Sequence, residues 1–272
     1  MKRLMLADRA IETERTAFVM GIVNVTPDSF WEKSRGGAES ALRLIDEGAD
    51  MLDVGGESSR PGSEYVSAEE ELRRIIPVIE AVRRKSDIPI SVDTRKTSVM
   101  KAAFEAGADI LNDISALEDD PALAPFAASV LIPVILMHKR GIPSTMQNDT
   151  AYADVFSEVS DYLEERAHFA VGSGIAPEKI IVDPGIGFGK NLEANAALIR
   201  RCGQLCNKKY TVLMALSRKT CVGQMTGRDV SERLAGTLAA DLISVMNGAD
   251  IVRVHDVKET VDTLSVLRYT GW

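Results

Sequence analysis

The sequence predicts a (β/α)8 barrel, in which eight parallel strands alternate with helices. Eight short apolar runs have the length of buried strands, and the stretches between them have helical spacing. Each run closes in polar or charged residues, and in this fold the carboxyl ends of the strands form the active-site mouth. The length of 272 residues is also close to that of one such barrel, about 250 residues. We therefore expect one α/β domain over residues 1–272, with its core at about 18–268.

The runs share a polar ending but differ in the chemistry that this ending offers. In chain order they close at Asn24, Gly56-Glu57, Asp93, Asn112-Asp113, His138, Asp183, Ser217-Arg218-Lys219 and Arg253-Val254-His255-Asp256. Amides, carboxylates, imidazoles and cations are thus expected around a single mouth.

Capping and turn residues predict the helices between the runs. Ser67 opens S-A-E-E, a capping box, and glycines follow several of the helical stretches, as at a helix end. Asp256 is expected to cap the last helix. The predicted helices cover about 37–48, 67–85, 94–106, 122–128, 151–171, 191–202, 230–247 and 257–268. Near-copies of Gly-Ala-Asp at 47–50, 105–109 and 247–250 stand directly before strands, as a repeated βα unit would produce.

The composition is that of an ordinary globular protein, with 45% hydrophobic and 26% charged residues. No run of eighteen apolar residues is present, so we expect no membrane span. Acidic residues near the start stand where a signal peptide needs an apolar stretch, which predicts a cytoplasmic protein. A net charge of −8 disfavours nucleic-acid binding. It still permits an anionic ligand at a local cationic cluster.

The three cysteines, Cys202, Cys206 and Cys221, are odd in number and too few for a disulfide framework. Cys202 and Cys206 are one helical turn apart, but no His or further Cys lies nearby in the sequence to complete a metal site. We expect packing or surface residues.

The first loop follows Asn24 with Thr26-Pro27-Asp28 and then Phe30 and Trp31. The amide oxygen of Asn24 suits a hard cation such as Mg²⁺ when phosphates complete its shell. An Asx-type turn is the structural alternative. Apolar side chains at a loop tip gain little unless they fold over a ligand, so a substrate lid is the second hypothesis.

Two loops have compositions that suit a ligand. The stretch DVGGESSRPG, residues 53–62, combines glycines with Ser58, Ser59 and Arg60, which can bind phosphate oxygens, although an ordinary loop remains the alternative. The stretch DPGIGFGK, residues 183–190, lacks the spacing of phosphate-binding loops. Its glycines instead favour Phe188 lying against a flat ring.

Asp93, Asn112 and Asp183 each close an apolar strand and are expected to point into the mouth. Carboxylates there suit a heterocycle edge rich in N–H donors, such as an aminopyrimidinone. A divalent metal held by two carboxylates and His255 is the competing interpretation.

Lys219, Arg253 and His255 close the last two strands, the usual phosphate-binding quarter of this barrel. The Arg-Val-His spacing places both side chains on one strand face, and Arg253 can stack on an aromatic plane. A structural role for His255 is the alternative. The residues together predict a site for a flat heterocycle and an anion, without a covalent nucleophile.

The ordered blocks resemble those of the dihydropteroate synthase family. They are MGIVNVTPDSF, DVGGESSRPG, SVDTRK, LNDIS, LMHKRGIPSTMQ, VDPGIGFGK, ALSRK and IVRVHDVKE, and they cover about residues 18–268. The resemblance implies a pterin-binding barrel that condenses 6-hydroxymethyl-7,8-dihydropterin diphosphate with p-aminobenzoate and releases pyrophosphate in folate biosynthesis. It also implies a homodimer through the last helices and a pocket that sulfonamides occupy in relatives.

The resemblance further implies a role for each site residue. It assigns the pterin to Asp93, Asn112, Asp183, Phe188, Lys219 and Arg253; the diphosphate to Asn24 through Mg²⁺ and to Ser59, Arg60, Arg253 and His255; and p-aminobenzoate to Phe30, Pro61 and Thr220. Of these, Asp93, Asp183, Lys219, Arg253 and His255 are the expected catalytic set. The implied chemistry is loss of diphosphate to a carbocation, followed by attack of the amine.

The first loop departs from the family pattern. Relatives continue as SFSDGG, whereas this chain reads SFWEKSRGG, with Trp31 to Arg35 in the altered part. The acidic residue that relatives place near the cation is absent from its usual position, and Glu32 is the candidate replacement. Two further hypotheses stand beside the synthase. One is the pterin-binding barrel of corrinoid methyltransferases, which shares the Asp and Asn pattern for the pterin, and the other, favoured by the altered loop, is a pterin-binding paralogue without catalysis.

Overall fold

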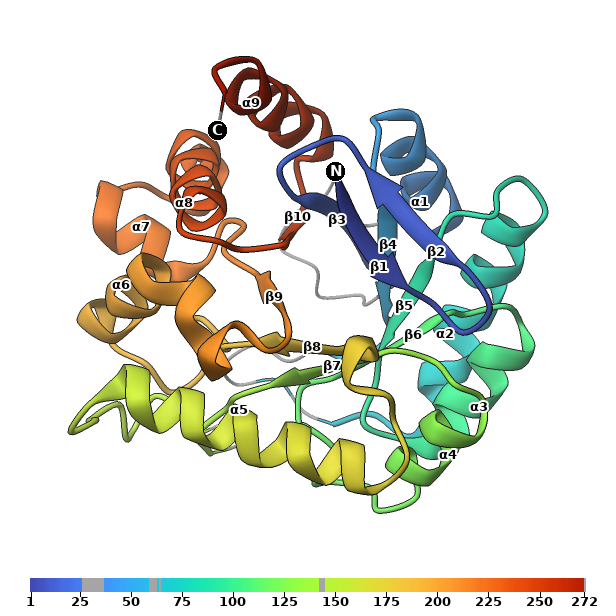
Figure 1. Cartoon of the computed structure of the whole chain (residues 1–272). Helices are drawn as coiled ribbons and strands as arrows, with labels where there is room; N and C mark the ends of the chain where they lie inside the picture. Colours follow the sequence, from blue (N-terminus) through green and yellow to red (C-terminus); the bar gives the residue numbers. More distant parts are fainter. Residues whose placement is uncertain (26–36, 59–62, 64, 142–144, 272) are drawn as a thin grey trace.

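A computed structural model describes residues 1–25, 37–58, 63, 65–141 and 145–271 of the chain. Its parallel strands close into a barrel in the order β10-β3-β4-β5-β6-β7-β8-β9, with helices around the outside (Figure 1). The predicted (β/α)8 barrel is confirmed. The predicted site residues Phe30, Ser59, Arg60 and Pro61, and Trp31 to Arg35 with Glu32, lie outside the described residues.

Each barrel strand matches one of the predicted apolar runs. The strands are β3 Phe18–Asn24, β4 Met51–Gly55, β5 Ile90–Asp93, β6 Ile110–Asp113, β7 Val134–Met137, β8 Ile180–Asp183, β9 Thr211–Met214 and β10 Ile251–Val254. Their register sets the height of the polar ends, because Gly55 pairs with Asp93 and Asp93 pairs with Asn112. Asp183 lies beside Met137 in the same way.

The helices follow the predicted order, with differences at their ends. They are α1 Gly37–Asp46, α2 Ala68–Arg83, α3 Thr97–Glu105, α4 Leu123–Ser129, α5 Val155–Gly172, α6 Leu192–Arg201, α7 Thr220–Thr226, α8 Leu234–Met246 and α9 Val257–Tyr269. The Ser67 cap is confirmed, since its hydroxyl accepts the N–H of Glu70. α5 begins later than predicted because Asp154 caps it, and α8 begins later because a 3₁₀ turn at Val230–Glu232 precedes it.

Two elements of the sequence analysis were wrong or missed. The side chain of Asp256 does not cap α9. Its carboxylate instead binds the guanidinium of Arg218, with Nε to Oδ2 at 2.8 Å and Nη2 to Oδ1 at 3.0 Å. The short helix α7, directly after Lys219, was not predicted. The cysteines are free and buried, which confirms the packing interpretation.

An unpredicted antiparallel hairpin, β1 Lys2–Met5 and β2 Ala10–Thr13, crosses the end of the barrel where the strands begin (Figure 1). Leu4 and Leu6 are buried against the first residues of the strands, including Phe18 and Met51. Within the described part of the chain, no helix combines the length and the apolar character needed to cross a membrane.

Ion pairs hold the hairpin and the segment after it to the barrel. Their aspartates are the last residues of the three Gly-Ala-Asp copies. The pairs are Lys2 with Asp250, Arg9 with Asp109 at 3.6 Å and Arg15 with Asp50 at 2.8 Å. Each aspartate also accepts a backbone N–H at or near the start of a strand. Asp50 accepts from Val19, Asp109 from Ile90 and Asp250 from Val212. The sequence repeat therefore marks a repeated strand-start motif.

One buried acid is left without a partner. Asp241 on α8 is 1% exposed, and neither carboxylate oxygen has a hydrogen bond among the described residues. Burial, and then the charge of Asp256, raise its pKa well above the usual value. The folded protein therefore keeps this proton to a higher pH than the unfolded chain, and stability falls as pH rises towards the folded pKa.

We predict that Asp241→Asn stabilises the protein at neutral pH, because the amide carries no charge to desolvate. The increase in melting temperature should be negligible near pH 4 and reach at least about 2 °C, the equivalent of roughly 0.5–1 kcal/mol, by pH 8. Thermal unfolding of both proteins across this pH range is the measurement. An equal difference at every pH would contradict the assignment of the effect to ionisation.

Candidate active site

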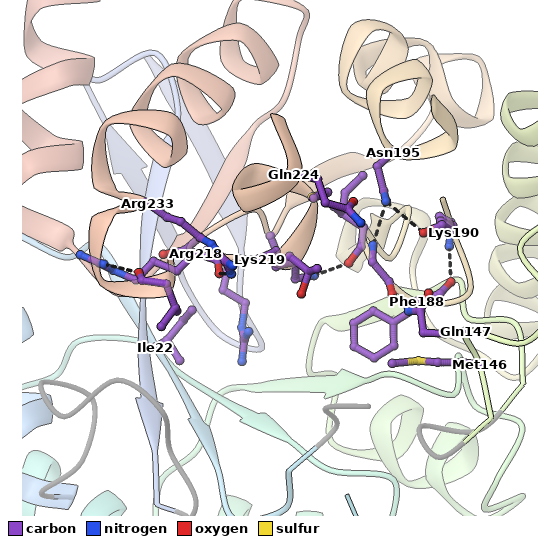
Figure 2. A pocket seen from close by; sticks show the side chains of 18 of the residues that line it. Ile22, Met146, Gln147, Phe188, Lys190, Asn195, Arg218, Lys219, Gln224 and Arg233 are labelled. Atoms are coloured by element: carbon purple, nitrogen blue, oxygen red, sulfur yellow. Dashed lines mark hydrogen bonds between the residues drawn. The ribbon is translucent and has the colours of Figure 1, made fainter. Parts of the chain in front are cut away.

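A cavity of about 770 Å³ opens among the carboxyl ends of the strands (Figure 2). This volume is typical of a site for a small molecule. The predicted residues that line it are Asn24, Asp93, Phe188, Lys219, Thr220, Arg253 and His255. Two others, Asn112 and Asp183, are only 6% and 5% exposed and do not appear in its lining.

A buried ion pair connects β10 with β4, the two strands that flank β3. The Nε of Arg253 on β10 lies 2.6 Å from Oδ2 of Asp53 on β4, and Asp53 is wholly buried. The amide of Asn112 donates to the two oxygens of Asp53 at 3.2 and 3.3 Å. A second carboxylate, that of Asp93, lies 3.5 Å from Nη2 of Arg253. The guanidinium is therefore positioned by protein carboxylates before any ligand binds.

Asp53 is a site residue that was not predicted from the sequence. Its signal was a single carboxylate inside an otherwise apolar strand, Met51–Gly55. A charge in that position needs a buried partner, because an isolated carboxylate in the interior is very costly.

Crowding of carboxylates changes the acidity of Asp93. Burial raises its pKa, and the neighbouring charge of Asp53 raises it further, against the lowering effect of Arg253. A carboxyl group that keeps its proton can donate a hydrogen bond as well as accept one. Asp93 is therefore suited to a ligand edge that presents both acceptors and donors.

Lys219 and Phe188 form another wall of the cavity, and the buried carboxylate of Asp183 interacts electrostatically with Lys219. Burial raises the pKa of Asp183, and the charge of Lys219 is the largest opposing effect. The ammonium of Lys219 donates to the carbonyl of Ile186 at 2.6 Å and lies 5.0 Å from the centre of the Phe188 ring. A carboxylate, an ammonium and an aromatic face together suit a flat polar heterocycle.

The residues after β9 and at the end of β10, which were predicted to bind an anion, agree with the prediction only in part. His255 is 9% exposed, and Nδ1 of its ring lies 2.9 Å from the hydroxyl of Ser217. Arg218 borders the cavity, but its guanidinium binds Asp256 and the carbonyls of Val230 and Ser231. Lys219, Arg253 and His255 are the predicted basic residues that line the cavity at this end.

Residues that the sequence analysis did not single out complete the lining. Met146 and Gln147 come from the loop after β7, Lys190 from the loop after β8, and Gln224 and Arg233 from the region of α7 and α8. The types of these residues gave little indication of a site in the sequence. Only Met146, an apolar residue in a turn-rich loop, could have indicated a cavity wall, and it is 4% exposed in the structure.

The alternative of a metal held by carboxylates and histidine is not supported. Among the residues that the structure describes, no group of three His, Cys, Asp or Glu side chains could hold an ion. Glu57 borders the cavity, but its carboxylate accepts from Arg95 and Lys96, both at 2.7 Å. Asn24, half-buried at the end of β3, offers one amide oxygen, so a cation there needs most of its ligands from a bound molecule.

The sequence profile of the family described as pterin binding enzyme matches residues 20–255. The dihydropteroate synthase of Escherichia coli K12 is 46% identical over 260 residues, which cover 93% of this chain and 91% of that protein.

Solved structures of dihydropteroate synthases have the same fold. That of Xanthomonas albilineans with 4-aminobenzoic acid superimposes with a TM-score of 0.90 at 44% identity, over 98% of this chain and 97% of the other. The same enzyme in complex with 7,8-dihydropteroate gives 0.86 at 42%, over 98% of each chain. The Yersinia pestis enzyme with a sulfonamide drug gives 0.92 at 38%, over 99% of each.

The chain therefore belongs to the family of pterin-binding enzymes. The extent and level of the identity place it, within that family, among the dihydropteroate synthases.

Proposed function

We propose that this protein joins 6-hydroxymethyl-7,8-dihydropterin diphosphate to p-aminobenzoate and releases pyrophosphate, the dihydropteroate-forming step of folate biosynthesis. The observation that carries the proposal is one cavity with two kinds of wall. Lys219 and Phe188 in the lining, with the buried Asp183 that interacts electrostatically with Lys219, suit a flat, N–H-rich ring, while Arg253 and His255 suit an anion. The relatives found in complex with 4-aminobenzoic acid and 7,8-dihydropteroate support this choice of substrates.

The pterin ring is assigned to Asp93, Asn112, Asp183, Phe188 and Lys219, with Arg253 stacked on its plane. The raised pKa of Asp93 supports this assignment, because a protonated carboxyl can donate to a ring acceptor while ionised Asp183 accepts from ring N–H groups. Phe188 adds an apolar face to the lining. Asn112 and Asp183 are buried and are not part of the described lining, so their contact with the ring requires the site to change when the ligand binds.

The diphosphate is assigned to Arg253 and His255, with Ser59 and Arg60 from the loop after β4. Asn24 fits Mg²⁺ here, because its neutral oxygen can join the diphosphate oxygens in a hard-cation shell. When bound, Mg²⁺ would neutralise charge on the diphosphate. Phe30, Pro61 and Thr220 are assigned to p-aminobenzoate and to the sulfonamide site; of these, Thr220 lies in the described cavity lining.

The reaction then follows from where charge develops. The bond between the pterin methylene carbon and the diphosphate oxygen breaks, and its electron pair leaves with the diphosphate. Arg253 and His255 stabilise that departing charge, and ionised Asp183 stabilises the positive charge on the pterin. The amine nitrogen of p-aminobenzoate then forms the new C–N bond and loses a proton.

We further propose that residues 18–268 form one pterin-binding unit, that the protein works in the cytoplasm, and that it is a homodimer. The exposed apolar side chains Ile243 and Met246 on α8 and Val266 and Tyr269 on α9 support a dimer contact at these helices.

The decisive test supplies the protein with the dihydropterin diphosphate, Mg²⁺ and p-aminobenzoate and detects dihydropteroate and pyrophosphate. We expect equal amounts of both products. Pterin binding without any product would instead support the paralogue without catalysis.

Asp183→Asn should cut both pterin affinity and turnover by at least about tenfold, or 1.4 kcal/mol, because the charge-assisted bonds to the ring are lost. Calorimetric binding and steady-state kinetics measure the two effects. Asp161→Asn, the same change at an exposed position of α5, is the control and should behave as the parent. Unchanged kinetics in Asp183→Asn would remove Asp183 from the site.

Chelation of divalent cations should lower turnover by at least about tenfold and weaken binding of the pterin diphosphate, while binding of a pterin without diphosphate stays unchanged. Added Mg²⁺ should restore the activity. Asn24→Ala should then need more Mg²⁺ for half-maximal rate. Full activity of the chelated protein would overturn the assignment of Mg²⁺.

A further inference from the structure

Lys190 is a buried ammonium that lacks the usual partner. It is 3% exposed, and among the described residues its Nζ contacts backbone carbonyls and an imidazole and not a carboxylate. Its contacts are the carbonyls of Gly185 at 3.0 Å and Phe188 at 2.9 Å, and Nδ1 of His138 at 2.9 Å; the His138 carbonyl follows at 3.4 Å. An ammonium has three N–H groups, and the three nearest acceptors occupy them. No donor is left for a ligand.

These contacts close the loop of residues 185–189 around Lys190. Gly185, Gly187 and Gly189 adopt positive φ, and a Cβ on Gly185 would stand 1.9 Å from the carbonyl oxygen of His138. The loop therefore lies pressed against the end of β7 in a conformation that other residues rarely adopt. Such a backbone needs bonds from outside the loop to keep one shape.

Other side chains bind the same short backbone. Lys219 donates to the Ile186 carbonyl at 2.6 Å, Gln147 donates to the Gly187 carbonyl at 2.6 Å, and Asn195 accepts the Gly187 N–H at 2.8 Å (Figure 2). The Phe188 ring points from this loop into the cavity lining. Lys190 differs from the other three because its single nitrogen binds the loop at two carbonyls, Gly185 and Phe188, and so spans it.

We propose that Lys190 is a positioning residue for the pterin wall: it sets the shape of the loop 185–189 and thereby the position of Phe188 and of the Ile186 carbonyl that Lys219 binds. The proposal rests on the proposed function for the identity of the ligand. Burial, together with the charges of Lys219 and Arg140, lowers the pKa of Lys190 to about 7 against the opposing effect of Asp183. The lowered pKa reflects the free-energy cost of burying the ammonium. Such a cost is expected if the charged group is kept to fix the shape of the loop.

Lys190→Met keeps most of the side-chain length and removes the donors. We expect the KM and Kd for the dihydropterin diphosphate to rise at least about tenfold, while the KM for p-aminobenzoate changes less than about twofold. Amide hydrogen exchange in the segment 185–190, measured without any ligand, should become faster. Wild-type turnover reports on the proposed function, whereas the exchange rate reports on the loop even if the reaction is different.

Lys179→Met is the matched control. Lys179 is also buried, 9% exposed, and donates to backbone carbonyls, those of Leu131 at 2.6 Å and Ala7 at 3.3 Å, but at the opposite end of the barrel. It should lose stability without any change in pterin KM or in exchange of the segment 185–190. Equal effects of the two substitutions on pterin KM would show that Lys190 acts through stability alone.

Lys190→Gln, which retains amide donors, provides the second variant should Lys190→Met fail to fold, and its effects should be intermediate. Phe188→Ala combined with either variant should raise pterin KM by less than the product of the single effects, because both changes act on one wall. A folded Lys190 variant with wild-type pterin KM, Kd and exchange would overturn the proposal.

Discussion

The ion pair between Asp53 and Arg253 is the interaction on which the rest of the site depends. It joins β4 to β10, the two neighbours of β3 in the barrel, and Asp53 also accepts from Asn112 on β6. Removing either charge would leave its partner buried and unpaired, which is strongly unfavourable. Asp53 also lies near Asp93 on the neighbouring strand β5, and its charge contributes to the raised pKa of Asp93 while Arg253 opposes this effect.

The barrel separates this polar end from an apolar interior. Residues such as Met20, Ile110 and Ile181 fill the interior below the mouth, and the hairpin adds Leu4 and Leu6 from the other end. Stability is concentrated in the interior and at the hairpin, whereas the mouth has the buried charges and the strained loop. Many side chains at the mouth can thus serve a ligand without also holding the barrel closed.

Much of the fold could be predicted from the sequence because a parallel strand buried on both faces is a continuous apolar run. The hairpin was missed because its four-residue strands, KRLM and AIET, show no alternation of charged and apolar residues, and because it is held by aspartates far along the chain. Asp256 was expected to cap α9, but its carboxylate binds the guanidinium of Arg218, which is the stronger partner. Asp53 and Lys190 escaped notice for a related reason: their partners are a distant guanidinium and backbone carbonyls, which come together only in the folded chain.

The hairpin also constrains the order in which the chain can finish folding. Lys2 binds Asp250, which lies 248 residues later, and β3 pairs with β10 along Phe18–Gly21. Lys2 and β3 therefore leave the ribosome long before their partners around residue 250, and contacts of such long sequence separation form slowly. Until then Leu4 and Leu6 are exposed to solvent, and the edge of β3 that pairs with β10 has no partner strand. The interval before ring closure is when this chain most needs protection from aggregation.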